Sequence, residues 1–221
     1  MLLGGIDEAG RGSVIGPLVI AGISFDSKKI DRLKELNITD SKKTSPNKRK
    51  ELFNKIFGIC DSIFICKINC STIDKYVKLN KLNDLESIFM TIVADNIHAD
   101  KVIVDSCDVN PCRFQQEIKK RLVNKKISVY SFHKADLDNI VVSSASIIAK
   151  VTRDNEIAKL KEILGKDLGS GYPSDPKTKI FIYNEVFVKE SKNFIRFSWK
   201  PVKKILDENI KTKLFCQHLQ K

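Results

Sequence analysis

Two acidic residues stand directly before a glycine-rich turn in the segment GGIDEAGRGSVIGP, residues 4–17. Asp7 and Glu8 could bind a cation or transfer protons, whereas the glycines could hold the pyrophosphate of a dinucleotide. A dinucleotide loop needs a helix after its glycines, but here LVIAGISF follows, a β-branched segment typical of a strand. The acids are therefore the residues that need a chemical explanation.

The elements that must position these acids can be predicted from apolar patterns. Short segments rich in β-branched residues predict five strands, at residues 2–7, 17–25, 62–69, 101–105 and 126–132. A turn at residues 70–72 is predicted to follow the third strand. Short turns between consecutive strands favour antiparallel pairing at the start of the chain. Helical spacing of apolar residues predicts helices at about 83–97, 113–123 and 141–165. This order is typical of the α/β class, with a mixed sheet and helices on its faces.

The predicted sheet gives the acids a common edge. Asp7 and Asp105 both end apolar strands, and ligands of open α/β sheets bind at the carboxyl ends of strands. Neighbouring strand residues face opposite ways, so Asp7 and Glu8 can share one site only if the strand ends there and the chain turns, and residues 9–12 supply such a turn. Asp136 precedes the long helix, where it could join the site or only interact with the helix macrodipole, with Asp138 as the more natural cap.

Converging carboxylates indicate a metal site in a basic protein. Clustered carboxylates repel each other unless a cation is present, and two Mg²⁺ ions suit phosphodiester hydrolysis. The chain has 39 Lys and Arg against 27 Asp and Glu, a formal net charge of +12, which favours polyanionic partners. An acidic pocket on a basic surface is what a metal-dependent nuclease needs.

Several other classes of protein are disfavoured. The N-terminus has no signal-peptide pattern and no apolar run reaches the length of a membrane span, so we expect a soluble, cytoplasmic protein without membrane contact. The six cysteines form no C-x-x-C pair, and with three histidines they give no zinc-binding spacing. Whether Cys107 and Cys112 form a bridge stays open, with reduced thiols as the default in cytosol.

Taken together, five motifs resemble the type 2 ribonucleases H, known as ribonuclease HII, in their archaeal form. They are IDEAGRG, DSKK at 40–43, IVDSCDVNP at 103–111, KAD with VVSSASIIAKVTRD within 134–154, and GSGYPSDPKT at 169–178. The match continues in order to Lys200. The resemblance implies a ribonuclease H-like fold, a five-stranded mixed sheet flanked by helices with a C-terminal helical extension. We expect one catalytic domain over residues 1–221, of which about 176–221 is the extension.

The resemblance also implies an activity. Family members cut the phosphodiester 5′ of a ribonucleotide in RNA/DNA hybrids and at ribonucleotides embedded in duplex DNA, leaving a 3′-hydroxyl and a 5′-phosphate. Two Mg²⁺ or Mn²⁺ ions would act with substrate bound. Their catalytic and metal-binding carboxylates would be Asp7, Glu8, Asp105 and Asp136.

Substrate recognition is implied at two glycine-containing motifs. Gly10, Arg11 and Gly12 would bring backbone groups against the 2′-hydroxyl, the group that distinguishes RNA from DNA. Tyr172 would stack on the sugar of the next deoxynucleotide, so that the enzyme recognises an RNA-to-DNA junction. The alternative for Tyr172 is an aromatic side chain packed on the core.

Three further positions are predicted to bind substrate. Lys42 and Lys43 precede a helix beginning near residues 45–46 and would contact phosphates, although lysine pairs usually face solvent. Ser146 would either let the long helix approach the sheet or donate to a phosphate, and we favour the second interpretation.

The chain departs from the common family pattern at three positions where proline is frequent. Ser13, Cys107 and Ile140 replace these prolines and remove local backbone constraint without changing an acid. Whether the loops at these three positions are rigid is therefore not predicted.

The C-terminal segment has an excess of positive charge. Residues 176–221 carry 11 Lys and Arg against 4 Asp and Glu. Val202, Ile205, Leu206 and Ile210 have helical spacing, so the helix would pack one face and offer lysines to solvent or to a duplex. The tail TKLFCQHLQK has no clear sliding-clamp peptide, so clamp binding is unsupported by the sequence. We expect a monomer.

Two other functions stay open at this point. Another nuclease with a ribonuclease H-like core, such as a resolvase, would cut without reading ribose, and the GRG and Tyr172 motifs argue against it. A noncatalytic nucleic-acid-binding module would not need four converging acids.

Overall fold

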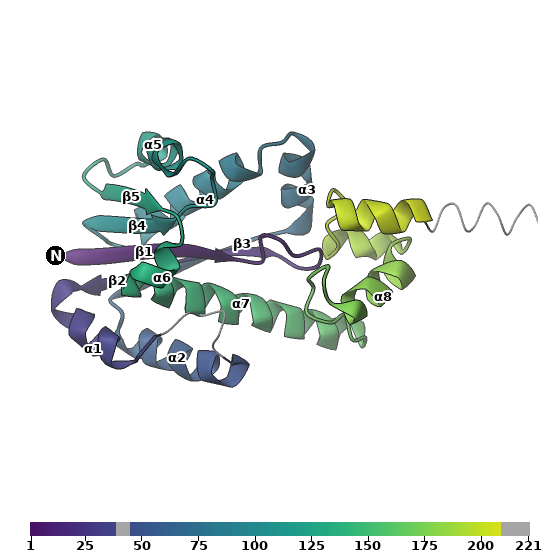
Figure 1. Ribbon diagram of the computed structural model, residues 1–221, viewed down its shortest axis with the longest axis horizontal. Helices are drawn as coiled ribbons and strands as arrows, with labels where there is room; N and C mark the ends of the chain where they lie inside the picture. The colour runs from purple at the N-terminus through teal and green to yellow at the C-terminus, as the bar shows by residue number, and fades with distance from the viewer. Residues whose placement is uncertain (39–44, 209–221) are drawn as a thin grey trace, which may run out of the picture. The chain divides into compact units, whose positions relative to one another are not determined.

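The computed structural model describes residues 1–38 and 45–208 of the chain, which form two compact units (Figure 1). One unit contains Met1–Ala9, Val19–Lys67 and Asn83–Arg153. The other contains Gly10–Leu18, Ile68–Leu82 and Asp154–Lys221, the last of these described as far as residue 208. The chain therefore enters each unit more than once.

The first unit is built on a five-stranded sheet in the order β3-β2-β1-β4-β5 (Figure 1). Its strands are β1 (Leu2–Ala9), β2 (Leu18–Asp26), β3 (Ser62–Ile68), β4 (Lys101–Asp105) and β5 (Ser128–Phe132). β1 pairs antiparallel with β2 and parallel with β4, and β4 pairs parallel with β5. The mixed five-stranded sheet expected from the sequence is confirmed.

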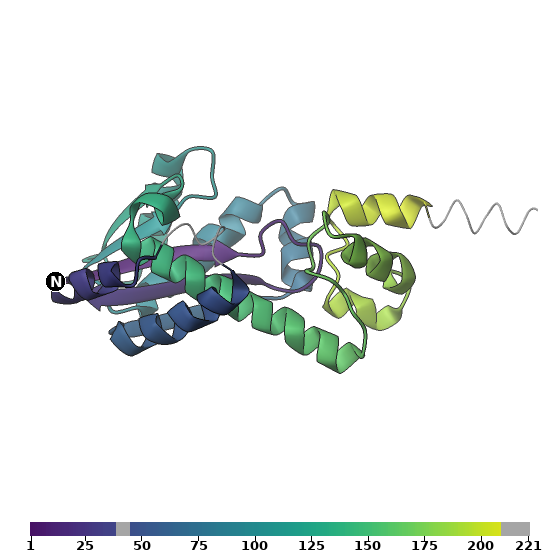
Figure 2. The same ribbon diagram turned by 60° about the horizontal axis from the view of Figure 1, so that its bottom comes forward.

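Helices cover both faces of this sheet (Figures 1 and 2). Helices α1 (Ile30–Glu35), α2 (Pro46–Ile59) and the first half of α7 (Ile140–Leu164) share one apolar cluster with β1 and β2. Helix α4 (Leu82–Asn96) covers the other face, where Val93 lies against Gly22 of β2.

Local capping explains where several helices begin. Helix α5 (Pro111–Arg121) starts at a proline after the N-cap Asn110, and α2 starts in the same way after Ser45. A 3-10 turn, η1 (Ser27–Lys29), precedes α1. Residues 70–72, interpreted from the sequence as a turn, instead begin α3 (Cys70–Lys78), because the Asn69 side chain accepts from the amide of Thr72 at 2.9 Å.

Gly5 lets α7 approach the sheet closely. A Cβ atom at this position would lie 2.5 Å from the carbonyl carbon of Val141 and 2.7 Å from the amide nitrogen of Val142. These are backbone atoms, which cannot rotate away, so any side chain at residue 5 would force strand and helix apart. Glycine is thus required where the helix crosses β1.

We expect Gly5→Ala to lower the free energy of unfolding by about 1–3 kcal/mol, the usual effect of overpacking. Gly58→Ala is the matched control, because no atom lies within 4 Å of a Cβ at Gly58 in α2. That control should be neutral or stabilise by up to about 1 kcal/mol, as alanine is the better helix former. Urea unfolding of both variants measures the difference, and equal stability would argue against the close packing of α7.

The second unit is helical and has its own apolar cluster. It contains α3, the second half of α7, α8 (Pro176–Glu185), the 3-10 turn η2 (Lys189–Asn193) and a helix at 200–208. Val202 is fully buried in this cluster, and Ile205 and Leu206 pack against it. Ile210 lies outside the described residues. Across the described ranges, no helix has the length and apolar character needed to cross a membrane.

Candidate active site

Asp7 and Asp105 lie side by side because β1 and β4 are parallel neighbours. Ile6 is paired with Val104, so the next residues of the two strands are the two acids. Asp7 is only 4% exposed. Burial, reinforced by the negative charge of Asp105, raises the pKa of the Asp7 carboxyl from 3.8 to about 6. The ionised pair is therefore electrostatically unfavourable by itself, which suits a site for a cation.

Helix α7 supports Asp7 from one face of the sheet. The buried hydroxyl of Ser146 forms a hydrogen bond with the Asp7 carboxyl, and Lys150 one turn later contributes a favourable positive charge. Both effects lower the pKa of Asp7 without overcoming burial. We had predicted Ser146 to donate to a phosphate, and here its hydroxyl acts on a carboxylate. Lys150 was missed, although its spacing of four residues from Ser146 places both on one helix face.

Asp136 lies next to the end of β4. It belongs to the short helix α6 (Ala135–Asp138), whose first amide, that of Ala135, donates to Oδ1 of Asp105 at 2.9 Å. The Asp136 side chain is 6% exposed, and its backbone carbonyl accepts from the hydroxyl of Ser143. Asp105 and Asp136 are therefore connected through the backbone of α6.

The cap of the long helix is neither of the predicted acids. The Oδ1 atom of Asn139 accepts from the amides of Val141 at 3.0 Å and Val142 at 3.3 Å. The first turn of α7 contains no acid. The capping role considered for Asp138 is wrong, and Asp136 is not an acid of the first turn of the long helix.

Alternation along β1 places Glu8 on the opposite face of the strand from Asp7. β1 continues through Glu8 to Ala9, with Glu8 paired to Ile20, so the strand does not end at the two acids as a shared site would require. Gly5 faces α7, and alternation along a strand puts Asp7 on that same face and Glu8 on the opposite one. Within residues 1–38 and 45–208, no group of three or more His, Cys, Asp or Glu side chains has metal-binding spacing. The structure thus brings Asp7 and Asp105 together with Asp136 beside them.

The GRG motif forms a tight turn in the second unit. The amide and the hydroxyl of Ser13 both donate to the carbonyl of Gly10, at 3.2 and 2.9 Å. These two hydrogen bonds constrain the turn at Ser13, the position at which the family pattern commonly has a proline. Around Gly12, no atom lies within 4 Å of the place of a Cβ, so the backbone there faces open space. Arg11 and Gly12 are presented at the tip of the turn.

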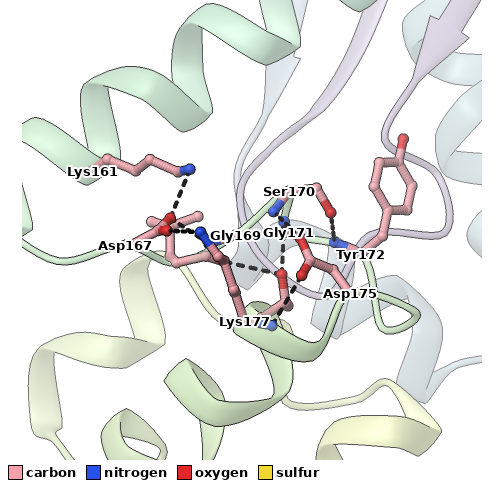
Figure 3. A network of polar contacts seen from close by, with 10 residues as sticks. Lys161, Asp167, Gly169, Ser170, Gly171, Tyr172, Asp175 and Lys177 are labelled. Atoms are coloured by element: carbon pink, nitrogen blue, oxygen red, sulfur yellow. Dashed lines mark hydrogen bonds and ion pairs between the residues drawn. The ribbon is translucent and has the colours of Figure 1, made fainter.

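The GSGYPSDP loop belongs to the same unit and is fixed by polar contacts (Figure 3). Asp175 accepts from the amide of Ser170 at 2.6 Å and caps α8 through the amide of Lys177 at 2.9 Å. These hydrogen bonds hold the pKa of Asp175 below its usual range. Gly169 has φ +68°, and a Cβ there would lie 2.7 Å from Oδ2 of Asp175. Glycine is therefore required for the loop to close.

Tyr172 projects from this loop. Its ring is half-buried and points away from the polar network around Asp175 (Figure 3). The preceding residue, Gly171, accepts from the amides of Val14 at 2.8 Å and Ile15 at 3.2 Å. The turn containing Gly12 and the loop containing Tyr172 are thus hydrogen-bonded neighbours within the second unit.

Comparison with known proteins identifies the family. The profile described as Ribonuclease HII matches residues 4–202. A ribonuclease HII of Thermococcus sibiricus is 45% identical over 218 residues, which cover 96% of this chain and 95% of that protein. This chain belongs to the ribonuclease HII family. A ribonuclease HII of Pyrococcus furiosus is 42% identical, with 96% of this chain and 94% of that protein covered.

Solved structures of ribonuclease HII proteins share the fold. The crystal structure of ribonuclease H2 from Pyrococcus horikoshii OT3 has a TM-score of 0.86 and 40% identity, covering 96% of this chain and all of that chain. Ribonuclease HII of Archaeoglobus fulgidus, solved as a complex with PCNA, has a TM-score of 0.81 and 36% identity over 90% of this chain and 96% of that one. The ribonuclease H-like fold is confirmed, and the chain is an enzyme of the ribonuclease H class.

Two other expectations concern a lysine pair and a pair of cysteines. Lys42 and Lys43, predicted to contact phosphates, lie outside the described residues. Cys107 and Cys112 are present as thiols, so the two do not form a disulfide.

The raised pKa of Asp7 predicts how the metal-free ribonuclease depends on pH. An acid whose pKa is higher in the folded state than its ordinary value of 3.8 destabilises the fold once it must ionise. The loss begins near pH 4 and is complete above about pH 6, where it reaches on the order of 2–3 kcal/mol. In chelator at pH 7.5, Asp7→Asn should therefore melt several degrees above wild type, and at pH 4 the two should melt together.

Asp138→Asn is the matched control, because this side chain is exposed on α6 next to the same site. Its melting temperature should equal that of wild type at both pH values. A rise in melting temperature for Asp7→Asn that is equally large at pH 4 and pH 7.5 would contradict the electrostatic origin of the effect.

Proposed function

We propose that this protein is a metal-dependent endoribonuclease that hydrolyses the phosphodiester 5′ of a ribonucleotide. Its substrates would be RNA/DNA hybrids and duplex DNA with embedded ribonucleotides, and its products would carry a 3′-hydroxyl and a 5′-phosphate. The observation that carries the proposal is the pair Asp7 and Asp105 at adjoining strand ends, in a member of the ribonuclease HII family. Four acids on a basic chain suit a polyanionic substrate and its metals.

The carboxylates would hold Mg²⁺ or Mn²⁺, two ions per site when substrate is bound. Such ions activate a water and stabilise the leaving oxygen in phosphodiester hydrolysis. The buried Asp7 carboxyl beside Asp105 fits this requirement, since its ionised form needs a positive counterpart. Asp136, next to Asp105, would be a further ligand. The place of Glu8 in the set is carried over from the family alone.

Other residues would prepare these ligands or hold the substrate. Ser146 would orient the Asp7 carboxyl through its hydrogen bond, which we favour over a phosphate contact because the hydroxyl is fully buried. Lys42 and Lys43 would contact phosphates of the substrate. Lys203 and Lys204, exposed on the helix at 200–208, would contact the duplex.

The 2′-hydroxyl would be recognised by the backbone of Gly10, Arg11 and Gly12. The open space beside Gly12 leaves room for a ribose to approach the peptide groups. Tyr172 would stack on the adjoining deoxyribose, and its half-buried ring, which points away from the polar contacts that fix the loop, suits that role. These residues lie on neighbouring segments of the second unit, so that unit would bind both the ribose and the adjoining deoxyribose.

Two further aspects of assembly are binding to a sliding clamp and the oligomeric state. The Archaeoglobus fulgidus relative was solved with PCNA, whereas the tail TKLFCQHLQK of this chain does not support clamp binding. The tail lies outside the described residues. We propose a monomer.

A cleavage assay on three matched duplexes tests the proposed function. One duplex carries a single ribonucleotide, one is an RNA/DNA hybrid and one is all DNA, each incubated with Mg²⁺ or Mn²⁺. We expect nicking of the first two and no cutting of the third. Cutting of all three would indicate a ribose-independent nuclease such as a resolvase, and binding without cutting would contradict catalysis.

A further inference from the structure

A fully buried arginine lies behind the GRG turn in the second unit. Arg196 has no exposed surface, yet it carries a permanent positive charge. Placing a charge in a protein interior is unfavourable unless its donors are satisfied, and an apolar residue would fill the same space more simply. Its hydrogen bonds are therefore the feature that needs an explanation.

The guanidinium of Arg196 binds both ends of the turn. Nε and Nη2 donate to the carbonyl of Gly16 at 3.1 and 2.9 Å. Nη1 donates to the carbonyl of Arg11 at 3.1 Å. Because the guanidinium is planar and rigid, these three bonds fix the two carbonyls relative to each other.

The backbone of Arg196 is attached to the same segment. Its amide donates to the carbonyl of Val14 at 2.9 Å, between the two positions that the side chain binds. Residues 11, 14 and 16 are thus all tied to a single residue that follows them by 180 positions or more in the chain.

Neighbouring residues hold Arg196 in place. Its guanidinium lies 5.2 Å from the ring centre of Trp199, a cation–π contact. Asp74 of α3 accepts from the amides of Phe197 at 2.9 Å and Ser198 at 3.0 Å and from the Ser198 hydroxyl. The segment after Arg196 is therefore anchored independently of the turn.

We propose that Arg196 is a positioning residue that fixes the Gly10–Arg11–Gly12 backbone in the conformation that distinguishes ribose from deoxyribose. This inference rests on the proposed function, in which that backbone binds the 2′-hydroxyl. Arg196 lies behind the turn and acts on substrate only through the Arg11 and Gly16 carbonyls. It determines ribose selectivity, while the carboxylates determine the chemistry.

The preference for ribose in binding measures this role without cleavage. In a cleavage-deficient Asp105→Asn background, fluorescence anisotropy compares a duplex containing one ribonucleotide with the all-DNA duplex. The background protein should bind the first duplex more tightly. Adding Arg196→Lys keeps the charge but cannot reproduce the rigid fork, and should reduce the ratio of the two dissociation constants to about one, with affinity for the all-DNA duplex unchanged.

Arg121→Lys is the matched control, because the hydrogen bonds seen for Arg121 are to Glu117 of the same helix, α5, in the first unit. The ratio of the two dissociation constants for this variant should equal that of the background protein. Should Arg196→Lys be recovered unfolded, Trp199→Leu removes the ring beside the guanidinium and should lower the ratio partially. A ratio equal to that of the background protein, in folded Arg196→Lys or in folded Trp199→Leu, overturns the role of Arg196. Absence of any preference in the Asp105→Asn background itself would instead overturn the proposed recognition of ribose, and the role of Arg196 with it.

Discussion

Asp7→Asn and Asp105→Asn are each expected to reduce cleavage at a single ribonucleotide by on the order of 10³-fold or more, as when a unit of catalytic groups loses a member. The two carboxylates adjoin at the ends of β1 and β4, and either amide would remove a negative ligand from the proposed metal site. Duplex affinity should change little, because binding depends on the basic surface. Single-turnover cleavage and anisotropy binding measure the two effects separately.

Asp100→Asn is the matched control for the carboxylate variants. Asp100 immediately precedes β4 and accepts from the amide of Leu2 at 2.8 Å, at the opposite end of the same two strands. It should cleave as wild type does. Loss of duplex binding in step with loss of cleavage in Asp7→Asn or Asp105→Asn would contradict separate roles for the acids and the basic surface.

Tyr172→Ala is expected to reduce cleavage at an RNA-to-DNA junction by about 100-fold, the effect of a misplacement of about 1 Å between substrate and catalytic groups. The tyrosine ring points away from the network that holds its loop, so its loss should leave that loop folded. Tyr172→Phe retains the ring and should retain much of the activity. Junction cleavage and melting temperature, measured on both variants, test the recognition role.

The competing interpretation of Tyr172 predicts a different pattern. If the ring packs as a core residue, Tyr172→Ala should lose about 3 kcal/mol or more of stability, and its folded fraction should cut normally. Tyr183→Ala, at a more exposed tyrosine on α8 in the same unit, is the control and should change neither property.

The sequence was a good guide to the sheet because strand signals are local. Each strand is a short β-branched run that ends at a turn or a cap, and the observed bounds of β4, Lys101–Asp105, agree with the prediction. The start of α3 was misread because Ser71 and Thr72 are common in turns, whereas the Asn69 cap two positions earlier decides for a helix.

Within the candidate site, residues at strand ends were predictable and their supports were not. Asp7 and Asp105 could be placed together because both end apolar strands. These strands, β1 and β4, pair in parallel, which brings the two acids to the same edge of the sheet. The contacts of Ser146 with Asp7 and of Arg196 with Gly16 join segments far apart in the chain. No local pattern encodes such contacts, since they depend on how α7 and the 194–198 segment pack.

The position and chemistry of the nick in a duplex with one ribonucleotide test the proposed function most directly. Wild-type protein with Mg²⁺ or Mn²⁺ is incubated with end-labelled duplex, and the products are compared with markers of known ends. We predict one nick, 5′ of the ribonucleotide, with a 3′-hydroxyl on one fragment and a 5′-phosphate on the ribonucleotide-bearing fragment. A nick 3′ of the ribonucleotide with a cyclic or 3′-phosphate end, or cutting that continues in chelator, would contradict metal-dependent hydrolysis at this site.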